Sequence, residues 1–287
     1  MTRWGADSEY GVLRDVLLCP PENFTWRPTS AISRATLDSG RVFDRERALA
    51  QHAELVSAYE SAGVACHFLE PAEGLPYQVF ARDSSVTTPW GAFVTSPMQQ
   101  WRRGEYAPVV RFYQGAEIPI WQMASAGAIE GGDVMIVEPG CVVIGTGESR
   151  TELPAARQLA EFFEAEGWEA RVEPIPGHFL HIDVLLAILA PKLAAVCTEY
   201  ASGGLVRWLT AKGFELLDVP GPDAWKLGVN AMSLGGDRVL TGAGATSLND
   251  QMSARGLELV APELDMFTLG GGGAHCLSQA LRRDRLG

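Results

Sequence analysis

The segment Gly140-Cys-Val-Val-Ile-Gly145 decides the fold, because it is the clearest copy of a unit that recurs along the chain. Short apolar runs rich in β-branched residues and bounded by glycine are typical of buried strands. Related runs begin at Gly91, Lys192 and Asp237, at intervals of roughly 50 residues, and an interval of this size indicates a repeat architecture. A second series keeps a similar interval and consists of acidic residues, namely Asp83, Asp133, Asp183 and Asp237.

Helical patterns lie between the strand-like runs. Apolar residues at helical spacing predict helices over residues 45–62, 153–166 and 205–212, a weaker helix over 103–115 and a short one over 252–255. Glycine follows these stretches and ends them. An extended segment comes after each, over residues 64–69, 118–121, 169–173, 214–219 and 257–260. The repeated unit is therefore strand, strand, helix, strand.

Five units of this kind fill the 287-residue chain, with the first unit split between the two chain ends. A unit of about 50 residues cannot bury its own apolar face, so neighbouring copies must pack together. We therefore predict an α/β fold in which five ββαβ units form a closed ring around a pseudo-fivefold axis. An ordinary open α/β sheet is the alternative. Length alone suggests about two domains, whereas the repeat predicts a single domain over residues 1–287.

The composition is 47% apolar and 20% charged, which is typical of a globular protein and excludes a disordered chain. The net charge of −12 disfavours nucleic acid and acidic membranes as partners and favours a cationic small molecule, although solubility alone also explains it. No apolar run reaches the roughly 18 residues of a membrane span, and the N-terminus has no signal-peptide pattern. Five scattered cysteines without a CxxC pair favour a reducing compartment, so we expect a cytoplasmic protein.

The sharpest local signal is Gly270-Gly-Gly-Gly-Ala-His-Cys276. Four glycines let backbone amides and a ligand approach the cysteine closely. A phosphate-binding loop is disfavoured because no Lys-Ser/Thr follows the glycines. A buried apolar cysteine is the plainer reading of Cys276 alone, but together with the glycine run it is a candidate nucleophile. We interpret the other four cysteines as structural.

A cysteine nucleophile needs a general acid and base, usually histidine. His181 stands out because it belongs to His181-Ile-Asp183, and positions two apart in a strand face the same side. We therefore expect Asp183 to orient His181 and raise its pKa. His178 would face away and ranks second, whereas His52 and His67 lie in ordinary helix and strand patterns.

Acidic residues open two successive repeats, in Phe80-Ala-Arg-Asp83 and in Glu130-Gly-Gly-Asp133. In a closed ring these starts converge on the axis, where their carboxylates would meet a cation; the alternative is a pair of surface turns. Arg150, between a strand and a helix, is able to bind a carboxylate bidentately, or is an ordinary surface arginine.

A zinc site formed by two histidines, one aspartate and one cysteine is another interpretation. Zinc takes histidine, cysteine and carboxylate ligands, but the spacing of these four matches no zinc motif, so we expect no metal. The four are His181, Asp183, His275 and Cys276.

Taken together, the motifs resemble those of the guanidino-group-modifying enzymes of the pentein superfamily, which includes arginine deiminases, dimethylarginine dimethylaminohydrolases and amidinotransferases. The resemblance spans residues 80–277 in the family's order, although Ile182 stands where the family has leucine. It implies a five-bladed ring of ββαβ units around a central site, which agrees with the repeat. Chain length and Glu130 resemble the compact hydrolases. The matching motifs are Phe80-Ala-Arg-Asp83, Glu130-Gly-Gly-Asp133, Gly147-Glu-Ser-Arg-Thr151, His181-Ile-Asp183, Asn230 and Gly271-Gly-Gly-Ala-His-Cys-Leu277.

The resemblance also implies roles for the three catalytic candidates. Cys276 would attack the guanidinium carbon and form a covalent thiouronium intermediate. His181 would protonate the leaving amine and then deprotonate the incoming water. Glu130 would hydrogen-bond the guanidinium and contact His181.

Four further residues are implied as substrate-binding. Asp83 would hydrogen-bond the guanidinium nitrogens, and Asp183 is the paired acid of the His-x-Asp motif. Arg150 would hold the carboxylate of the substrate, with Arg82 as a weaker candidate for that role. The resemblance implies neither a cofactor nor a metal.

We therefore expect a hydrolase of arginine or an N-substituted (methylated) arginine that releases ammonia or an alkylamine and forms citrulline. An amidinotransferase is the alternative within the family. A non-catalytic pentein binding protein is the alternative from another class, but it would need neither Cys276 nor His181. The sequence predicts a small cationic guanidino substrate as the partner. It leaves open the exact substrate, whether residues 20–28 form a lid, and whether the protein is a homo-oligomer.

Overall fold

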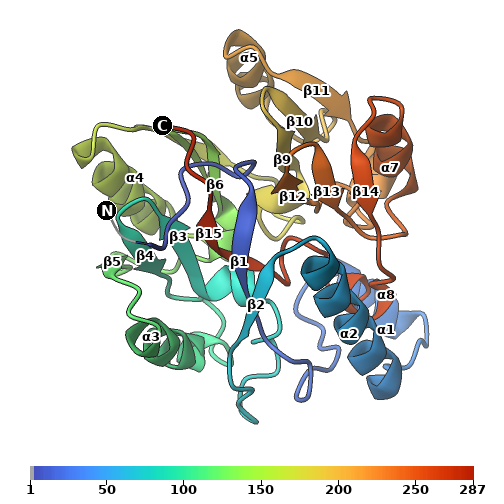
Figure 1. Cartoon of the computed structure of the whole chain (residues 1–287). Coiled ribbons are helices and arrows are strands. Elements are labelled where there is room, and N and C mark those ends of the chain that lie inside the picture. Colours follow the sequence, from blue (N-terminus) through green and yellow to red (C-terminus); the bar gives the residue numbers. More distant parts are fainter. Residues whose placement is uncertain (1–2) are drawn as a thin grey trace.

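The computed structural model describes residues 3–287, and within that range its strands form five three-stranded sheets arranged around a common centre (Figure 1). The sheets, in order of hydrogen bonding, are β15 (Gln279–Arg283), β1 (Leu13–Leu18) and β2 (Ala65–Phe68); β3 (Ser85–Thr88), β4 (Gly91–Val94) and β5 (Ile120–Met123); β6 (Val134–Glu138), β7 (Cys141–Thr146) and β8 (Glu169–Pro174); β9 (Leu186–Ala190), β10 (Leu193–Val196) and β11 (Glu215–Asp218); and β12 (Met232–Gly235), β13 (Arg238–Leu240) and β14 (Glu258–Val260).

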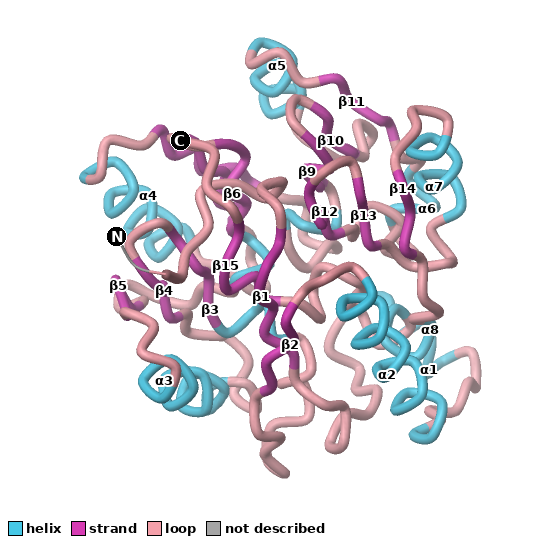
Figure 2. The backbone as a smooth tube through the Cα atoms, viewed as in Figure 1, coloured by secondary structure: helices cyan, strands magenta, loops and turns pink. Residues whose placement is uncertain are grey.

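The helices connect the strands and lie outside the ring (Figure 2). They are α1 (Ala31–Asp38), α2 (Arg45–Ser61), α3 (Tyr106–Gly115), α4 (Leu153–Ala165), α5 (Gly203–Ala211), α6 (Gly221–Ala224), α7 (Thr246–Ser253) and α8 (Asp265–Thr268), and the 3₁₀ turns are η1 (Ala81–Ser84), η2 (Arg103–Glu105), η3 (Gly131–Asp133) and η4 (Ile182–Val184).

All five sheets share one topology. The middle strand pairs antiparallel with one neighbour and parallel with the other, as β7 does with β6 and β8. A hairpin makes the antiparallel pair, whereas the parallel pair needs a crossover, which α4 provides in this sheet. The arrangement confirms the predicted ββαβ unit.

The strand β7 shows why the repeat reads as a continuous apolar run. Val142 and Ile144 pack with Leu159 and Phe163 of α4, whereas Val143 points to the other face and packs in the cluster shared with the next sheet. Successive side chains of a strand point to opposite faces. Because both faces of β7 are buried, the positions from Cys141 to Ile144 are all apolar.

The ring closes through contacts between neighbouring sheets. β15 packs beside β3, β6 beside η4, β9 beside β12, and β12 beside β1. The first sheet takes strands from both chain ends, because β1 pairs with β15, and the exposed Arg14–Asp284 ion pair at 2.6 Å lies beside that pairing. The prediction of five units with a split first unit is confirmed.

Two details of the predicted elements are wrong. The short helix expected over residues 252–255 is α7, which starts earlier because Leu248 and Met252 bury one face of an otherwise polar stretch. Asp237, predicted as the fourth member of the acidic series, lies in an exposed turn between β12 and β13 with a φ of 62°. The residue at the centre of the ring in this unit is instead Asn230, just before β12.

The turns η1, η3 and η4 lie just before β3, β6 and β9 and contact one another at the centre of the ring. Each carries one buried aspartate of the predicted series: Asp83, Asp133 and Asp183. The 50-residue repeat therefore brings carboxylates that are distant in sequence to one place.

No helix among residues 3–287 is long and apolar enough to cross a membrane.

Candidate active site

The glycine run before Cys276 is required by close packing. A Cβ atom at Gly272 would lie 2.2 Å from the Phe80 ring, and one at Gly273 would lie 2.8 Å from Oδ1 of Asn230. Gly271 has a φ of 107°, which side chains rarely adopt. Cys276 itself is only 4% exposed. The run is thus a tightly packed loop that presents the thiol from the inside of the ring.

Asn230 fixes this nucleophile loop. Its Oδ1 accepts hydrogen bonds from the backbone N–H groups of His275 at 3.0 Å and Cys276 at 3.2 Å, and its Nδ2 donates to the sulfur at 3.2 Å. Burial raises the pKa of the Cys276 thiol well above its usual value, and the charges of Asp183 and Asp83 raise it further. These surroundings therefore favour the neutral thiol.

His181 and Glu130 form a buried pair. Nε2 of His181 lies 2.8 Å from Oε2 of Glu130, which also accepts from Arg150 at 3.3 Å and Arg102 at 3.5 Å. Burial alone would raise the pKa of Glu130, but Arg150, Arg102 and His181 hold it well below its ordinary value. Burial alone would lower the pKa of His181, yet Asp83 and Glu130 raise it to about 9. At neutral pH His181 is an imidazolium able to donate a proton.

Arg102 is a site residue that the sequence analysis missed. It is 2% exposed and donates to Asp83 at 2.7 Å and to both oxygens of Glu105 at 2.8 Å. Its surroundings, Trp101-Arg102-Arg103-Gly104, look like an ordinary polar loop. The pairing with Glu105 three residues later is the one local signal, and it is common on surfaces.

The expected pairing of His181 with Asp183 is wrong. The segment after His181 forms the 3₁₀ turn η4 rather than a strand, so the two side chains do not share a face. Asp183 instead contacts His275, with Oδ2 2.9 Å from Nδ1, and lies 3.4 Å from the sulfur of Cys276. His181 belongs with Glu130. The structure therefore divides the four residues considered for zinc into two groups.

The expectation for Arg82 is also corrected. Its guanidinium is 2% exposed and donates to Glu9 at 3.0 Å and to the backbone oxygens of Gly131, at 3.2 Å, and Val134. It does not line the cavity beside Cys276. Arg82 joins the N-terminal segment to η3, so it is not placed to hold a substrate carboxylate.

Arg150 does line that cavity, as expected. It donates to Glu130 and, at 3.2 Å, to the backbone oxygen of Thr29, but within residues 3–287 its buried Nε has no acceptor. Two buried carboxylate oxygens in the same range, Oε1 of Glu130 and Oδ1 of Asp183, likewise have no donor. Such groups are costly to leave unpaired. Of these three residues, Arg150 lines the cavity, whereas Glu130 and Asp183 lie behind it, in contact with its lining residues His181 and Cys276.

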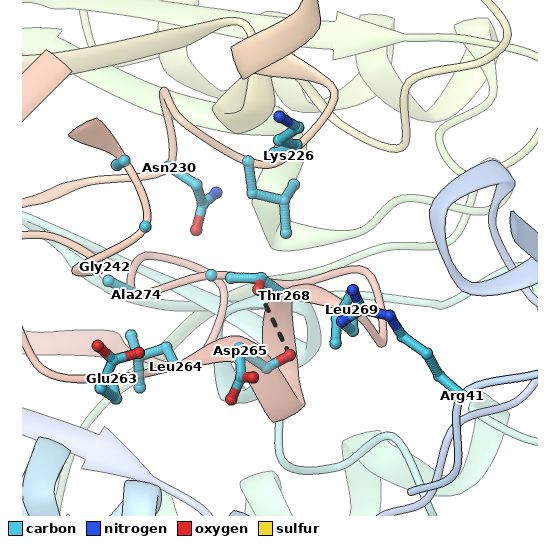
Figure 3. A pocket seen from close by; sticks show the side chains of 14 residues that line it. Arg41, Lys226, Asn230, Gly242, Glu263, Leu264, Asp265, Thr268, Leu269 and Ala274 are labelled. Carbon is cyan, nitrogen blue, oxygen red and sulfur yellow. Dashed lines mark hydrogen bonds between the residues drawn. The ribbon is translucent and has the colours of Figure 1, made fainter. Parts of the chain in front are cut away.

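The cavity beside Cys276 is small. It holds about 10 Å³, roughly the space of one water molecule. A larger cavity of about 220 Å³ borders the same loop at Ala274 and contains Asn230, Lys226 and Arg41 (Figure 3). It is lined by neither Cys276 nor His181, so we place the active site at the smaller cavity.

Residues 20–28, a lid or a connection in the sequence analysis, are held by buried aromatic rings. Phe24 stacks on Phe267 with ring centroids 5.5 Å apart, and Nε1 of Trp26 donates to the backbone oxygen of Met266 at 2.6 Å. Thr29, the next residue after the segment, lines the cavity. The segment therefore packs against α8 and positions one wall of the site.

Asp83, Glu130 and His181 also offer donor atoms within 4.8 Å of one another, which is a set able to bind a cation. The guanidinium of Arg102 already contacts both carboxylates. The same acceptors therefore suit a planar guanidinium.

Comparison with known proteins identifies the family of this chain. The family model described as "N,N dimethylarginine dimethylhydrolase, eukaryotic" matches residues 20–283. The uncharacterized protein YkgA of Bacillus subtilis is 30% identical over 278 residues, covering 96% of this chain and 94% of that protein.

Two solved structures share the fold. One is the dimethylarginine dimethylaminohydrolase of Pseudomonas aeruginosa, a cysteine-to-serine mutant complexed with citrulline, with a TM-score of 0.79, 23% identity and coverage of 93% of this chain and 99% of that one. The other is the N-terminal domain of ArgZ, a cyanobacterial arginine dihydrolase, as a cysteine-to-serine mutant bound to its substrate, with a TM-score of 0.81, 18% identity and coverage of 95% and 99%. The chain therefore belongs to the N,N-dimethylarginine dimethylhydrolase family, a group of guanidino-modifying hydrolases with the pentein fold.

Proposed function

We propose that this protein hydrolyses the guanidinium group of arginine or a methylated arginine to citrulline and ammonia or an alkylamine, as a single domain over residues 1–287. One observation carries the proposal. A buried thiol, Cys276, shares a small cavity with the protonated His181, and the neighbouring carboxylates Glu130 and Asp183 each have an unpaired oxygen. A planar cation with several N–H donors satisfies these acceptors by charge-assisted hydrogen bonds.

The reaction begins when the substrate cation enters. Its positive charge offsets Asp83 and Asp183, lowers the pKa of Cys276 and favours the thiolate, so the thiol loses its proton to solvent. The thiolate attacks the guanidinium carbon, so a C–S bond forms. His181 then gives its proton to the departing nitrogen, the C–N bond breaks, and a thiouronium intermediate remains.

Water completes the cycle. His181, now neutral, takes a proton from water as the oxygen attacks the thiouronium carbon. The C–S bond then breaks as the hydroxyl of this adduct gives its proton to the departing sulfur, so the thiol of Cys276 is restored and the carbon becomes the ureido group of citrulline. Glu130 holds His181 in position in both steps through the 2.8 Å contact.

We assign specificity for an amino acid to two arginines of the cavity wall. Arg102 and Arg150 both line the cavity, and the unpaired Nε of Arg150 is a donor for the substrate carboxylate. We assign this role to Arg150, with Arg102 beside it.

Unmethylated arginine fits the site better than dimethylarginine. Two carboxylates act on the thiol: Asp183 lies 3.4 Å from the sulfur, and the charge of Asp83, which belongs to the Asp83–His181–Glu130 group, also raises the pKa of the thiol. A dimethylated nitrogen has no N–H to offer either carboxylate and would set methyl groups against one of them. Dimethylarginine, suggested by the family name, is the second candidate.

A citrulline assay against arginine, monomethylarginine, dimethylarginine and agmatine tests the proposal. We expect citrulline from arginine, with dimethylarginine slower. Cys276→Ser should remove turnover, and a chelator should leave it unchanged. Urea as the product, or amidino transfer to an added amine instead of hydrolysis, would overturn the assignment.

The five cysteines carry no disulfide, which supports a reducing, cytoplasmic location.

A further inference from the structure

His275 is a buried titratable group that the reaction above does not use. Its ring is 3% exposed and lies between two carboxylates, with Nδ1 2.9 Å from Oδ2 of Asp183 and Nε2 3.5 Å from Oε2 of Glu9. The sulfur of Cys276 lies 3.4 Å from the same Oδ2 of Asp183. His275 is therefore one carboxylate removed from the nucleophile.

The groups facing His275 come from three segments, and they favour its charged form. Burial lowers the pKa of His275 and the Arg82 guanidinium of η1 lowers it further, but Asp183 of η4 and Glu9 of the N-terminal segment together raise it above its ordinary value. Burial alone would raise the pKa of Asp183, yet His275 keeps it below its ordinary value. His275 and Asp183 are therefore both charged.

Glu9 argues for a cation rather than a neutral ring. A neutral imidazole that donates from Nδ1 to Asp183 has a lone pair on Nε2, which would face a buried carboxylate. Glu9 is ionised because Arg82 donates to it at 3.0 Å and, despite burial, keeps its pKa far below the ordinary value. Only a ring protonated on both nitrogens suits both neighbours.

We propose that His275 is a positioning residue whose imidazolium keeps the Asp183 carboxylate ionised and holds its Oδ2, so that Oδ1 stays free for the substrate guanidinium. This inference rests on the proposed function, because it assigns Asp183 to the substrate. The cation also offsets the repulsion that Asp183 exerts on a thiolate at Cys276. His275 itself acts only through Asp183.

The first experiment reads the charge directly and does not depend on any substrate. In the ¹⁵N-histidine NMR spectrum, the signals lost in His275→Asn identify His275. We expect both of its ring nitrogens to be protonated at pH 7.5, and Glu9→Gln to lower the midpoint of this protonation. A neutral His275 at pH 7 overturns the proposal.

The second experiment measures KM and kcat for arginine from pH 6 to 9. Asparagine can still donate to Asp183 but carries no charge, so His275→Asn should let Asp183 take up a proton as the pH falls. KM should then rise by about tenfold per pH unit below the new pKa, while the wild-type KM stays flat. The variant's kcat should change less than its KM. A flat KM with a uniformly lower kcat would indicate a merely structural role and overturn the proposal.

Two variants complete the design. Glu9→Gln lies behind His275 and should shift the KM profile in the same direction by a smaller factor, so it carries the test if His275→Asn does not fold. His67→Asn is the matched control, because His67 pairs with Asp15 at 2.9 Å on β2 and should leave the profile unchanged. If wild-type protein turns over no guanidino substrate, the proposed function fails, and the NMR result alone decides the charge of His275.

Discussion

Replacing Arg150 tests whether the site recognises an amino acid. Arg150 is 3% exposed, lines the cavity beside Cys276, and has one buried donor, Nε, without an acceptor in residues 3–287. Its other contacts are to Glu130 at 3.3 Å and to the backbone oxygen of Thr29 at 3.2 Å. The free donor should hold the substrate carboxylate, and Arg150→Gln should remove that interaction.

The size of the effect follows from the kind of bond lost. A hydrogen bond to a charged group contributes about 1.5–3 kcal/mol. At about 1.4 kcal/mol per tenfold, the loss corresponds to roughly a 10- to 150-fold change. Arg150→Gln should therefore reduce the preference for arginine over agmatine, which lacks the carboxylate, by a factor in this range.

The assay is kcat/KM for arginine and agmatine with wild type, Arg150→Gln and Arg150→Lys. Agmatine is the internal control, since Arg150 also supports Glu130 and its loss will slow both substrates. Arg150→Lys keeps the charge but not the planar donor fork, so it should recover part of the preference. If Arg150→Gln lowered kcat/KM by the same factor for both substrates, Arg150 would only support Glu130. The proposal that Arg150 binds the substrate carboxylate would then be refuted.

Three further predictions follow from the same geometry. Cys276→Ser should abolish citrulline formation while still binding arginine by calorimetry; full activity would exclude the covalent mechanism. The pKa of His181, raised to about 9, predicts that kcat/KM falls as the pH rises through about 9, because the proton donor is lost. The stability that its ion pairs contribute is complete below about pH 6.5 and should be lost as the pH rises through about 9. A fall of kcat/KM centred near pH 6.5 would contradict this prediction. Gly272→Ala places a Cβ 2.2 Å from the Phe80 ring and should cost about 1–3 kcal/mol of stability and impair activity, whereas Gly74→Ala, with open space around it, should not; equal melting temperatures would refute the packing argument.

The ring was predictable because its signal is local and repeated. Each blade repeats an apolar run such as Gly140–Gly145 and a crossover helix, and burial on both faces of β7 keeps the run apolar. The start of α7 was not predictable, since its first turn is polar and only Leu248 and Met252 mark the buried face. Periodicity therefore locates an element better than it locates the element's first residue.

The site was predictable only in part, for a different reason. Cys276, His181, Glu130 and Asp83 lie in distinctive motifs, but their partners depend on how the blades meet. His181 and Asp183 separate because η4 turns the chain within three residues, which a strand pattern does not reveal.

Arg102 and Glu9 were missed because charged residues in polar loops are normally exposed. Both are buried here by tertiary contacts: Arg102 pairs with Asp83 of its own blade and with Glu130 of the next, and Glu9 pairs with Arg82 of another blade. Nothing in the sequence around either residue records such a distant partner.

The split first sheet makes the loop that carries Cys276 one of the last parts of the ring to be built. Cys276 lies just before β15, and the contacts beside the β1–β15 pairing join residues 270 positions apart in sequence. During synthesis on the ribosome, the other four sheets can form while β1 is not yet paired with β15. Pairing across so long a chain is slow and leaves apolar edges exposed meanwhile. Cys276 therefore reaches its position when β15 pairs with β1. The onset of catalysis would then report the closure of the ring.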